Sequence, residues 1–149
     1  MQDFFSDTPL NVQTLRSAVR DEGAGAVLVF EGTVRNHSAA GTGVIALVYE
    51  AKQPMADKII ARIITETQTE FSIAQVAVKH RLGKCELGEP TIVIAVSAAH
   101  RDEAYLASRK LIDRIKHEVP IWKQEIFSNG NTQWSEGCEA CTPSSKQPS

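Results

Sequence analysis

Hydrophobic residues recur with two periods along the chain, and these periods separate strands from helices. Four stretches rich in β-branched and apolar residues are typical of strands: 26–35, 44–50, 73–83 and 91–99. The last is apolar almost throughout, which favours a central place in its sheet. Three further stretches repeat apolar residues at i, i+3 and i+4 and predict helices: about 11–22, 54–71 and 102–117.

The ends of the predicted helices carry recognisable signals. Asn11 can cap the first helix and Gly23 can end it. Pro54 suits the first turn of the second helix. Pro120 ends the third, because proline disfavours helical geometry in the residue before it and has no N–H to donate.

The remaining segments predict loops, a hairpin and a tail. Residues 36–43 are small and polar and predict a mobile loop, and residues 84–90 are rich in turn formers. Residues 121–134 predict a hairpin that turns at Asn129–Gly130. Residues 136–149 are small, polar and proline-containing, which predicts a disordered tail after a single domain at 1–135. Helices separate strands without an internal repeat, so the expected class is α+β.

Composition narrows the class of protein. The chain has 149 residues and a net charge of −2, which argues against a general nucleic-acid or membrane-surface binder. No apolar run approaches the ~20 residues that span a bilayer, and the first residues do not resemble a secretory signal. Three cysteines do not make a disulfide framework, so we expect a reducing cytoplasm.

Basic side chains gather at the ends of several predicted elements. They are Arg35, His37, Lys79, His80, Arg81, His100, Arg101, Lys116 and Lys123. If the fold brings some of them together, they form a pocket for a small anion; the alternative is scattered surface charge.

His100 and Arg101 stand where a strand meets the start of a helix. Free backbone N–H groups at that position favour a bound phosphate or carboxylate, which Arg101 can grip in bidentate fashion. The alternative is that both side chains pair with Asp102 or Glu103 at the surface.

Lys116 and Lys123 flank the proline break. On its own, Lys116 is explained as a helix-end cation. Trp122 beside Lys123, in a segment stiffened by Pro120, can hold a lysine in a partly desolvated place where it acts as acid, base or nucleophile. The alternative is that Trp122 is plain core and both lysines are solvated.

The cysteines and the standard catalytic motifs give weaker indications of function. Cys138 and Cys141 have the spacing of half a zinc site or a redox pair, but no second pair follows them. Cys85 is interpreted as a packed small residue, and the polar residues at His80 as structural. No HExxH, Walker or GxGxxG motif is present.

Taken together, five motifs resemble those of the MoaE family, the large catalytic subunit of molybdopterin synthase. They are FEGTVRNHS from Phe30, YEA with PMA from Tyr49, HRLG from His80, VSAAHRDEA from Val96 and IDRIKHEVPIWKQE from Ile112. The resemblance covers roughly residues 10–134. One departure is Gln124, where the family often has lysine.

The resemblance implies an α/β hammerhead-like fold with an additional antiparallel β subdomain. It implies conversion of cyclic pyranopterin monophosphate (precursor Z) to molybdopterin, with sulfur from the Gly-Gly thiocarboxylate of a small ubiquitin-like partner of the MoaD type. Two large subunits would form the centre of a heterotetramer. No cofactor and no metal are implied.

The resemblance also assigns residues. Lys116 and Lys123 match the two active-site lysines, and Arg35, His100 and Arg101 match basic residues of the substrate pocket. The segments around Thr33, Val34 and Glu125 match binding segments. Two alternatives remain open at this point: a non-catalytic phosphate- or pterin-binding scaffold homologue, and a regulator whose loop 36–43 closes over another phosphorylated ligand.

Overall fold

The computed structural model describes residues 3–135. This part of the chain forms three helices and ten strands. In chain order the elements are β1 (Phe5–Ser6), α1 (Val12–Ala18), β2 (Ala26–Thr33), β3 (His37–Ser38), β4 (Gly41–Thr42), β5 (Val44–Ala51), α2 (Met55–Glu70), β6 (Gln75–Arg81), β7 (Gly83–Glu86), β8 (Pro90–Ala98), α3 (Arg101–Glu118), β9 (Ile121–Phe127) and β10 (Thr132–Ser135). The mixture of helices and strands confirms the α+β class.

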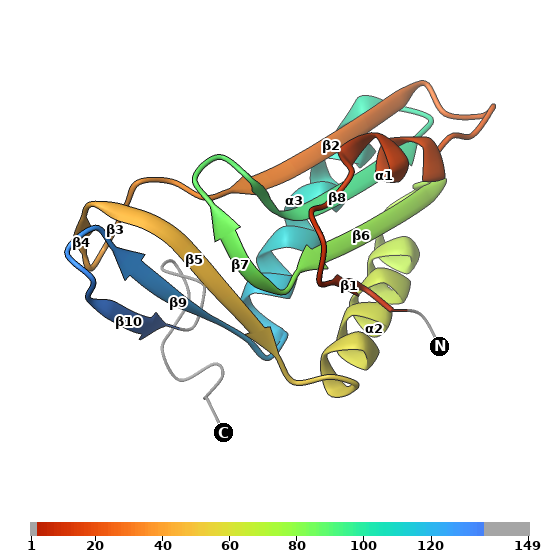
Figure 1. Cartoon of the computed structure of the whole chain (residues 1–149). Helices are drawn as coiled ribbons and strands as arrows, with labels where there is room; N and C mark the ends of the chain where they lie inside the picture. Colours follow the sequence, from red (N-terminus) through yellow and green to blue (C-terminus); the bar gives the residue numbers. More distant parts are fainter. Residues whose placement is uncertain (1–2, 136–149) are drawn as a thin grey trace.

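The first sheet has the order β1-β6-β8-β2, with β1 parallel to β6 and the other pairs antiparallel. Figure 1 shows α1 on one face of this sheet and α2 and α3 on the other. Strand β8 is buried on both faces after Pro90, which confirms its predicted central place. Its even-numbered residues face α2 and α3, whereas Val93 and Ala95 pack under α1 beside Leu15 and Val19.

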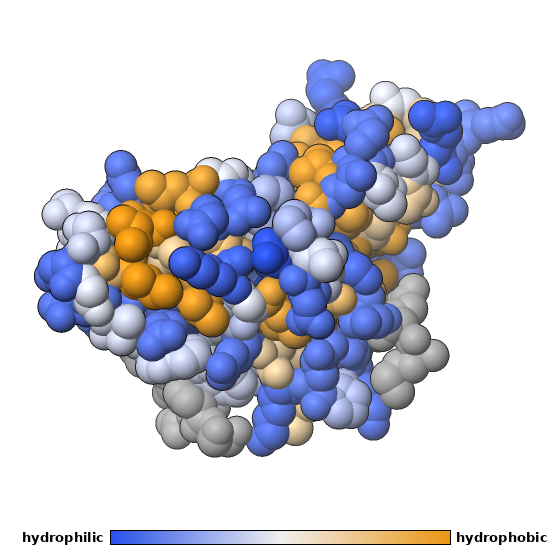
Figure 2. Space-filling view, viewed as in Figure 1, coloured by the Kyte–Doolittle hydropathy of each residue, from blue (hydrophilic) through white to orange (hydrophobic). Residues whose placement is uncertain are grey.

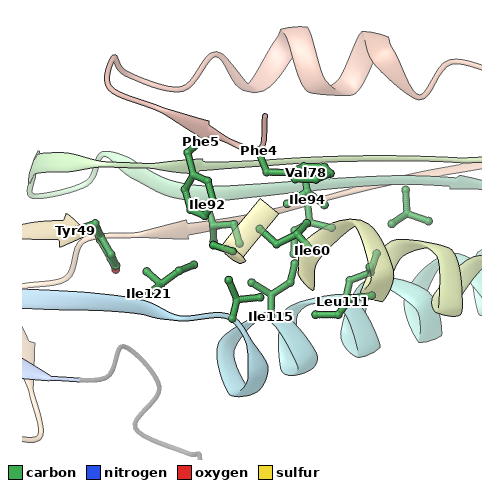
Figure 3. Packing of buried hydrophobic residues seen from close by; sticks show 14 of the residues in the cluster. Phe4, Phe5, Tyr49, Ile60, Val78, Ile92, Ile94, Leu111, Ile115 and Ile121 are labelled. Atoms are coloured by element: carbon green, nitrogen blue, oxygen red, sulfur yellow. The ribbon is translucent and has the colours of Figure 1, made fainter. Parts of the chain in front are cut away.

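The main core lies between the first sheet and helices α2 and α3. In Figure 3, Ile92 and Ile94 of β8 point toward Ile60 of α2 and toward Leu111 and Ile115 of α3. All five side chains are buried, and burying each one stabilises the fold by roughly 1.5–3 kcal/mol. This core holds α3 in a fixed place, and α3 carries Lys116 in its last turn.

The second sheet has the order β10-β9-β5-β7 and is antiparallel throughout. It lies beside the first sheet in Figure 1. Its β9–β10 hairpin turns at Asn129–Gly130 as predicted, with Gly130 at a φ of 89°, which favours glycine. The third helix ends at Glu118, before Pro120, and the Pro120 carbonyl then accepts the N–H of Lys52 at 3.1 Å.

The structure differs from the sequence analysis in four places. The first helix ends at Ala18 rather than near Glu22, because Asp21 Oδ1 accepts the Gly23 N–H in a local turn that competes with the helix. The predicted loop 36–43 contains the β3–β4 hairpin.

The other two differences concern pairings that local sequence signals do not show. The turn-rich stretch 84–90 begins with part of β7, which pairs with β5. The two-residue strand β1 has no sequence signal of its own and depends on pairing with His80 and Arg81.

The predicted tail at 136–149, with its Cys138/Cys141 pair, lies outside the described residues. Within residues 3–135, no helix is both long enough and apolar enough to cross a membrane.

Candidate active site

A pocket of about 220 Å³ opens where the two sheets meet the end of α3. Its lining comes from β2 and the β3 hairpin, from β5 and β9, from the start of β8 and from the last turn of α3. The lining residues are Gly32, Thr33, Arg35, His37, Ser38, Val44, Leu47, Tyr49, Thr91, Lys116, Lys123 and Glu125. Five of the eight residues predicted to form the site therefore lie around one cavity.

Lys116 and Lys123 reach this pocket from two different elements. Lys116 stands in the last turn of α3, and Lys123 stands on β9 after the break at Pro120. Successive strand residues point to opposite faces, so Lys123 and Glu125 share the pocket face of β9. Trp122 lies on the other face, paired in register with Glu50, and does not line the pocket. Trp122 is therefore not part of the pocket wall, and its effect on Lys123 stays a prediction.

Arg35 lies just beyond the end of β2. Its Nε donates to the carbonyl of His37 at 2.9 Å, which ties the guanidinium to the β3 hairpin. Val34 before it is buried in the main core, and its backbone bonds to Glu89 and Gly88 at 3.2 and 2.9 Å. Val34 thus lies in the core beside the pocket, where its backbone holds Arg35 in place, and its own part in binding stays a prediction.

Three polar side chains in the pocket wall are buried: Tyr49, Thr91 and Glu125. Desolvation by burial raises the pKa of Tyr49 to about 12, so the phenol stays neutral near pH 7. Glu125 is only 3% exposed, and its Oε2 has no hydrogen-bond partner among the described residues. A buried carboxylate oxygen of this kind is suited to accept a hydrogen bond from a ligand.

The charges in the lining favour an anionic ligand. Three basic side chains, those of Arg35, Lys116 and Lys123, share the lining with a single carboxylate, Glu125. Cations placed in a partly enclosed cavity attract phosphate and carboxylate groups and stabilise negative charge that develops during a reaction. Four of the nine basic residues singled out in the sequence, Arg35, His37, Lys116 and Lys123, therefore line one pocket, and binding of an anion there stays a prediction.

His100 and Arg101 do not reach the pocket of their own chain. His100 caps the start of α3 and Arg101 is its first residue, and both are exposed. Lys116 lies 15 residues farther along the same helix, about 22 Å away at 1.5 Å per residue. The two ends stay apart because α3 is one continuous helix from Arg101 to Glu118.

Two other polar candidates are structural. The His80 ring is buried between Phe5 and Tyr49, with centroid distances of 5.8 and 4.9 Å, and its Nδ1 contacts the Arg81 carbonyl at 2.8 Å. Cys85 is a buried free thiol whose pKa is raised by burial, which disfavours the reactive thiolate. Both match the structural interpretation of the sequence.

Sequence reasoning missed Thr91 and gave Tyr49 no role. Thr91 is the single hydroxyl at the start of the apolar run 91–96, and that exception to the pattern was an available signal. Tyr49 lies two residues after Leu47 on β5, so both side chains are on the same face of the strand. That this face lines the pocket became clear only once the pairing with β9 was known.

The fold and the pocket define an α+β protein with a pocket lined by several basic side chains. The profile of the MoaE protein family matches residues 5–118, and the chain belongs to this family. A Thermoplasma volcanium protein named molybdopterin synthase catalytic subunit is 46% identical over 129 residues, covering 87% of this chain and 93% of that protein.

Solved structures agree with this assignment. Molybdopterin synthase from Staphylococcus aureus superposes with a TM-score of 0.82 at 36% identity, covering 91% of this chain and 98% of that one. A chain from the complex of subunits 1 and 2 of the molybdopterin-converting factor of Helicobacter pylori has a TM-score of 0.72 at 19% identity, covering 88% of both chains. The second likeness concerns the fold alone.

Proposed function

We propose that this chain is the catalytic subunit of a molybdopterin synthase, a sulfurtransferase that converts cyclic pyranopterin monophosphate to molybdopterin in the cytoplasm. The observation that carries the proposal is the convergence of Lys116, Lys123 and Arg35 on one pocket in a member of the MoaE family. The sulfur donor is the C-terminal thiocarboxylate of a small ubiquitin-like subunit of the MoaD type.

The lining suits this chemistry because two anions must meet in it. The substrate carries a cyclic phosphate, and the donor tail ends in a thiocarboxylate. Arg35 and the lysines offset the repulsion between them, and Lys116 polarises the thiocarboxylate carbonyl while charge builds on its oxygen. Lys123 handles protons or contacts the pterin. Each tail supplies one sulfur: water cleaves the bond between the tail's carbonyl carbon and the transferred sulfur, and the tail leaves as a carboxylate. Two tails therefore serve the two dithiolene sulfurs.

Assembly completes the site. His100 and Arg101 are about 22 Å from Lys116 in their own chain, so they serve as phosphate ligands only if a second copy presents them. A central homodimer with a small subunit at each end provides that arrangement. Exposed apolar side chains are available for such contacts: Figure 2 shows them gathered over the second sheet, where Ile45 and Trp134 are nearly half exposed.

The lysines provide the direct test. With precursor and thiocarboxylated partner supplied, Lys116→Ala and Lys123→Ala should each lower the rate of dithiolene formation at least about 100-fold, since each removes a charge that acts on the reacting groups. Lys110→Ala is the matched control, because Lys110 lies on α3 outside the pocket and pairs with Glu70 at 3.8 Å. Near-normal turnover in both pocket variants, or no product from the unaltered protein, would overturn the proposal and favour a binding protein.

A further inference from the structure

The β7–β8 turn (residues 86–89) joins the second sheet to the first, and Glu89 organises it. The Glu89 Oε1 atom accepts the N–H of Glu86 at 2.6 Å, and the Glu89 N–H donates to the Glu86 carbonyl at 3.1 Å. These two bonds close the turn on itself. Gly88 has a φ of 80°, a conformation that favours glycine. The turn is therefore held in one conformation with the help of the Glu89 carboxylate.

The second oxygen of this carboxylate faces Arg81 at the end of β6. Glu89 Oε2 lies 3.7 Å from Arg81 Nη1, and the Arg81 side chain is only 11% exposed. Its Nε and Nη1 atoms have no hydrogen-bond partner among the described residues, so the negative charge of Glu89 offsets the cost of removing the guanidinium from water. This ion pair ties the β7–β8 turn to the end of β6.

The β7–β8 turn also clamps the segment that leads to Arg35. The Gly88 N–H donates to the Val34 carbonyl at 2.9 Å, and the Val34 N–H donates to the Glu89 carbonyl at 3.2 Å. Both backbone groups of Val34 are thus bonded to the turn, and the next residue, Arg35, lines the pocket. The lining, as far as residues 3–135 form it, includes neither Glu89 nor Arg81.

We propose that Glu89 is a positioning residue: paired with Arg81, it fixes the β7–β8 turn, which holds Arg35 where it meets the anionic group of the substrate. Glu89 acts through Arg35 and needs no contact with the substrate. The inference rests on the proposed function and deepens it, because it names the residues that set the place of the guanidinium in the pocket. A carboxylate outside the pocket thereby increases the affinity for an anion inside it.

The kinetics of the complete synthase test this role. Glu89→Ala should raise KM for the cyclic pyranopterin monophosphate roughly three- to tenfold and leave kcat nearly unchanged, since Arg35 is assigned to binding rather than to the sulfur transfer. The sign is diagnostic, because the loss of a negative charge near an anion site would by charge alone lower KM. Arg81→Gln should raise KM as well, and Arg81→Lys, which keeps the charge, should lie between Arg81→Gln and the unaltered protein.

A double variant shows whether Glu89 acts through Arg35. Arg35→Ala should raise KM by itself. Adding Glu89→Ala should then change KM less than about twofold, because the side chain that the turn positions is already gone. Effects of the two changes that multiply would refute the inference, and so would a KM for Glu89→Ala that equals or falls below that of the unaltered protein.

Lys84 offers a matched control beside the same turn. Its Nζ pairs with Glu86 Oε1 at 3.6 Å, and the two side chains are 59% and 62% exposed. Lys84→Ala removes this ion pair and leaves the bonds of Glu89 in place. KM should stay within about twofold of normal, because exposed ion pairs contribute little. A rise in KM equal to that of Glu89→Ala would show a nonspecific effect of changes near the turn and would count against the inference.

Amide exchange tests the clamp without turnover. By NMR, the Val34 N–H should exchange with solvent roughly five- to tenfold faster in Glu89→Ala than in the unaltered protein, and at an unchanged rate in Lys84→Ala. If the unaltered protein forms no product, the proposed function fails while this comparison still decides whether Glu89 holds Val34. An unchanged Val34 rate in Glu89→Ala would overturn the inference and leave the proposed function standing.

Discussion

At the scale of single residues, Tyr49 is the pocket side chain whose ionisation the fold alters most clearly. Desolvation raises its pKa from 10.0 to about 12, because the phenolate would lose its hydration in the wall between the sheets. The nearby carboxylate of Glu125 acts in the same direction. The phenol therefore stays protonated throughout the physiological range.

This pKa shift predicts a pH dependence of stability. A group whose folded pKa is raised contributes fully below its unfolded value, here pH 10, and loses that contribution as pH rises toward 12. The free energy of unfolding of the unaltered protein, minus that of Tyr49→Phe, should therefore fall by about 1.4 kcal/mol between pH 8 and pH 11. Urea unfolding of both proteins at both pH values measures this difference in free energy. A difference that does not change with pH would contradict the burial of the Tyr49 phenol.

At the scale of elements, an ion-pair network joins α2 to the end of α3, one turn from Lys116. Arg114 Nε and Nη2 contact the two oxygens of Glu118 at 2.6 and 3.0 Å, and its Nη1 contacts Glu66 of α2 at 2.8 Å. The hydrogen bond from Arg114 lowers the pKa of Glu118. The bidentate geometry gives this network more stabilising effect than an isolated surface pair.

We expect Glu118→Gln to lower the free energy of unfolding by about 1 kcal/mol at pH 7, which is roughly 3 °C in melting temperature. Because the pKa of Glu118 is lowered, its contribution is present above pH 4.5 and is lost as pH falls below that value. The two melting curves should therefore converge as the pH is lowered below 4.5. Asp113→Asn is the control: its i,i+4 pair with Arg109 is exposed and should contribute less than about 0.5 kcal/mol. Equal effects of both variants would argue against the network.

At the scale of the whole molecule, the position of His100 and Arg101 predicts that each site is shared between two copies. A mixture of Lys116→Ala and Arg101→Ala chains forms some mixed dimers. In these, one pocket receives both altered residues and the other receives neither, so the second pocket is active. The mixture should regain activity that neither variant has alone, measured as molybdopterin formed after subunit exchange. Activity no higher than that of the separate variants would place both residues in one chain's site or remove Arg101 from it.

Much of the secondary structure was predictable because its signals are local. Asn11 accepts from the N–H groups of Gln13 and Thr14, as its cap role required, and the break at Pro120 and the turn at Asn129–Gly130 are where the sequence placed them. The strands that were not predicted form only because they pair with distant residues. Strand β1 depends on pairing with β6, and β7 depends on pairing with β5. Both strands are too short to show an alternation of apolar and polar residues in the sequence.

The sequence by itself determined the α+β class, the central strand and the basic residues available for an anion site, because these follow from local periodicity and residue chemistry. Only the tertiary structure decided which of those residues meet. It brought Arg35, Lys116 and Lys123 together, turned Trp122 away, placed Val34 in the core and left His100 and Arg101 at the far end of α3. The physical reason is that strand register and helix length determine which way a side chain points and how far it reaches, and both depend on contacts between distant parts of the chain.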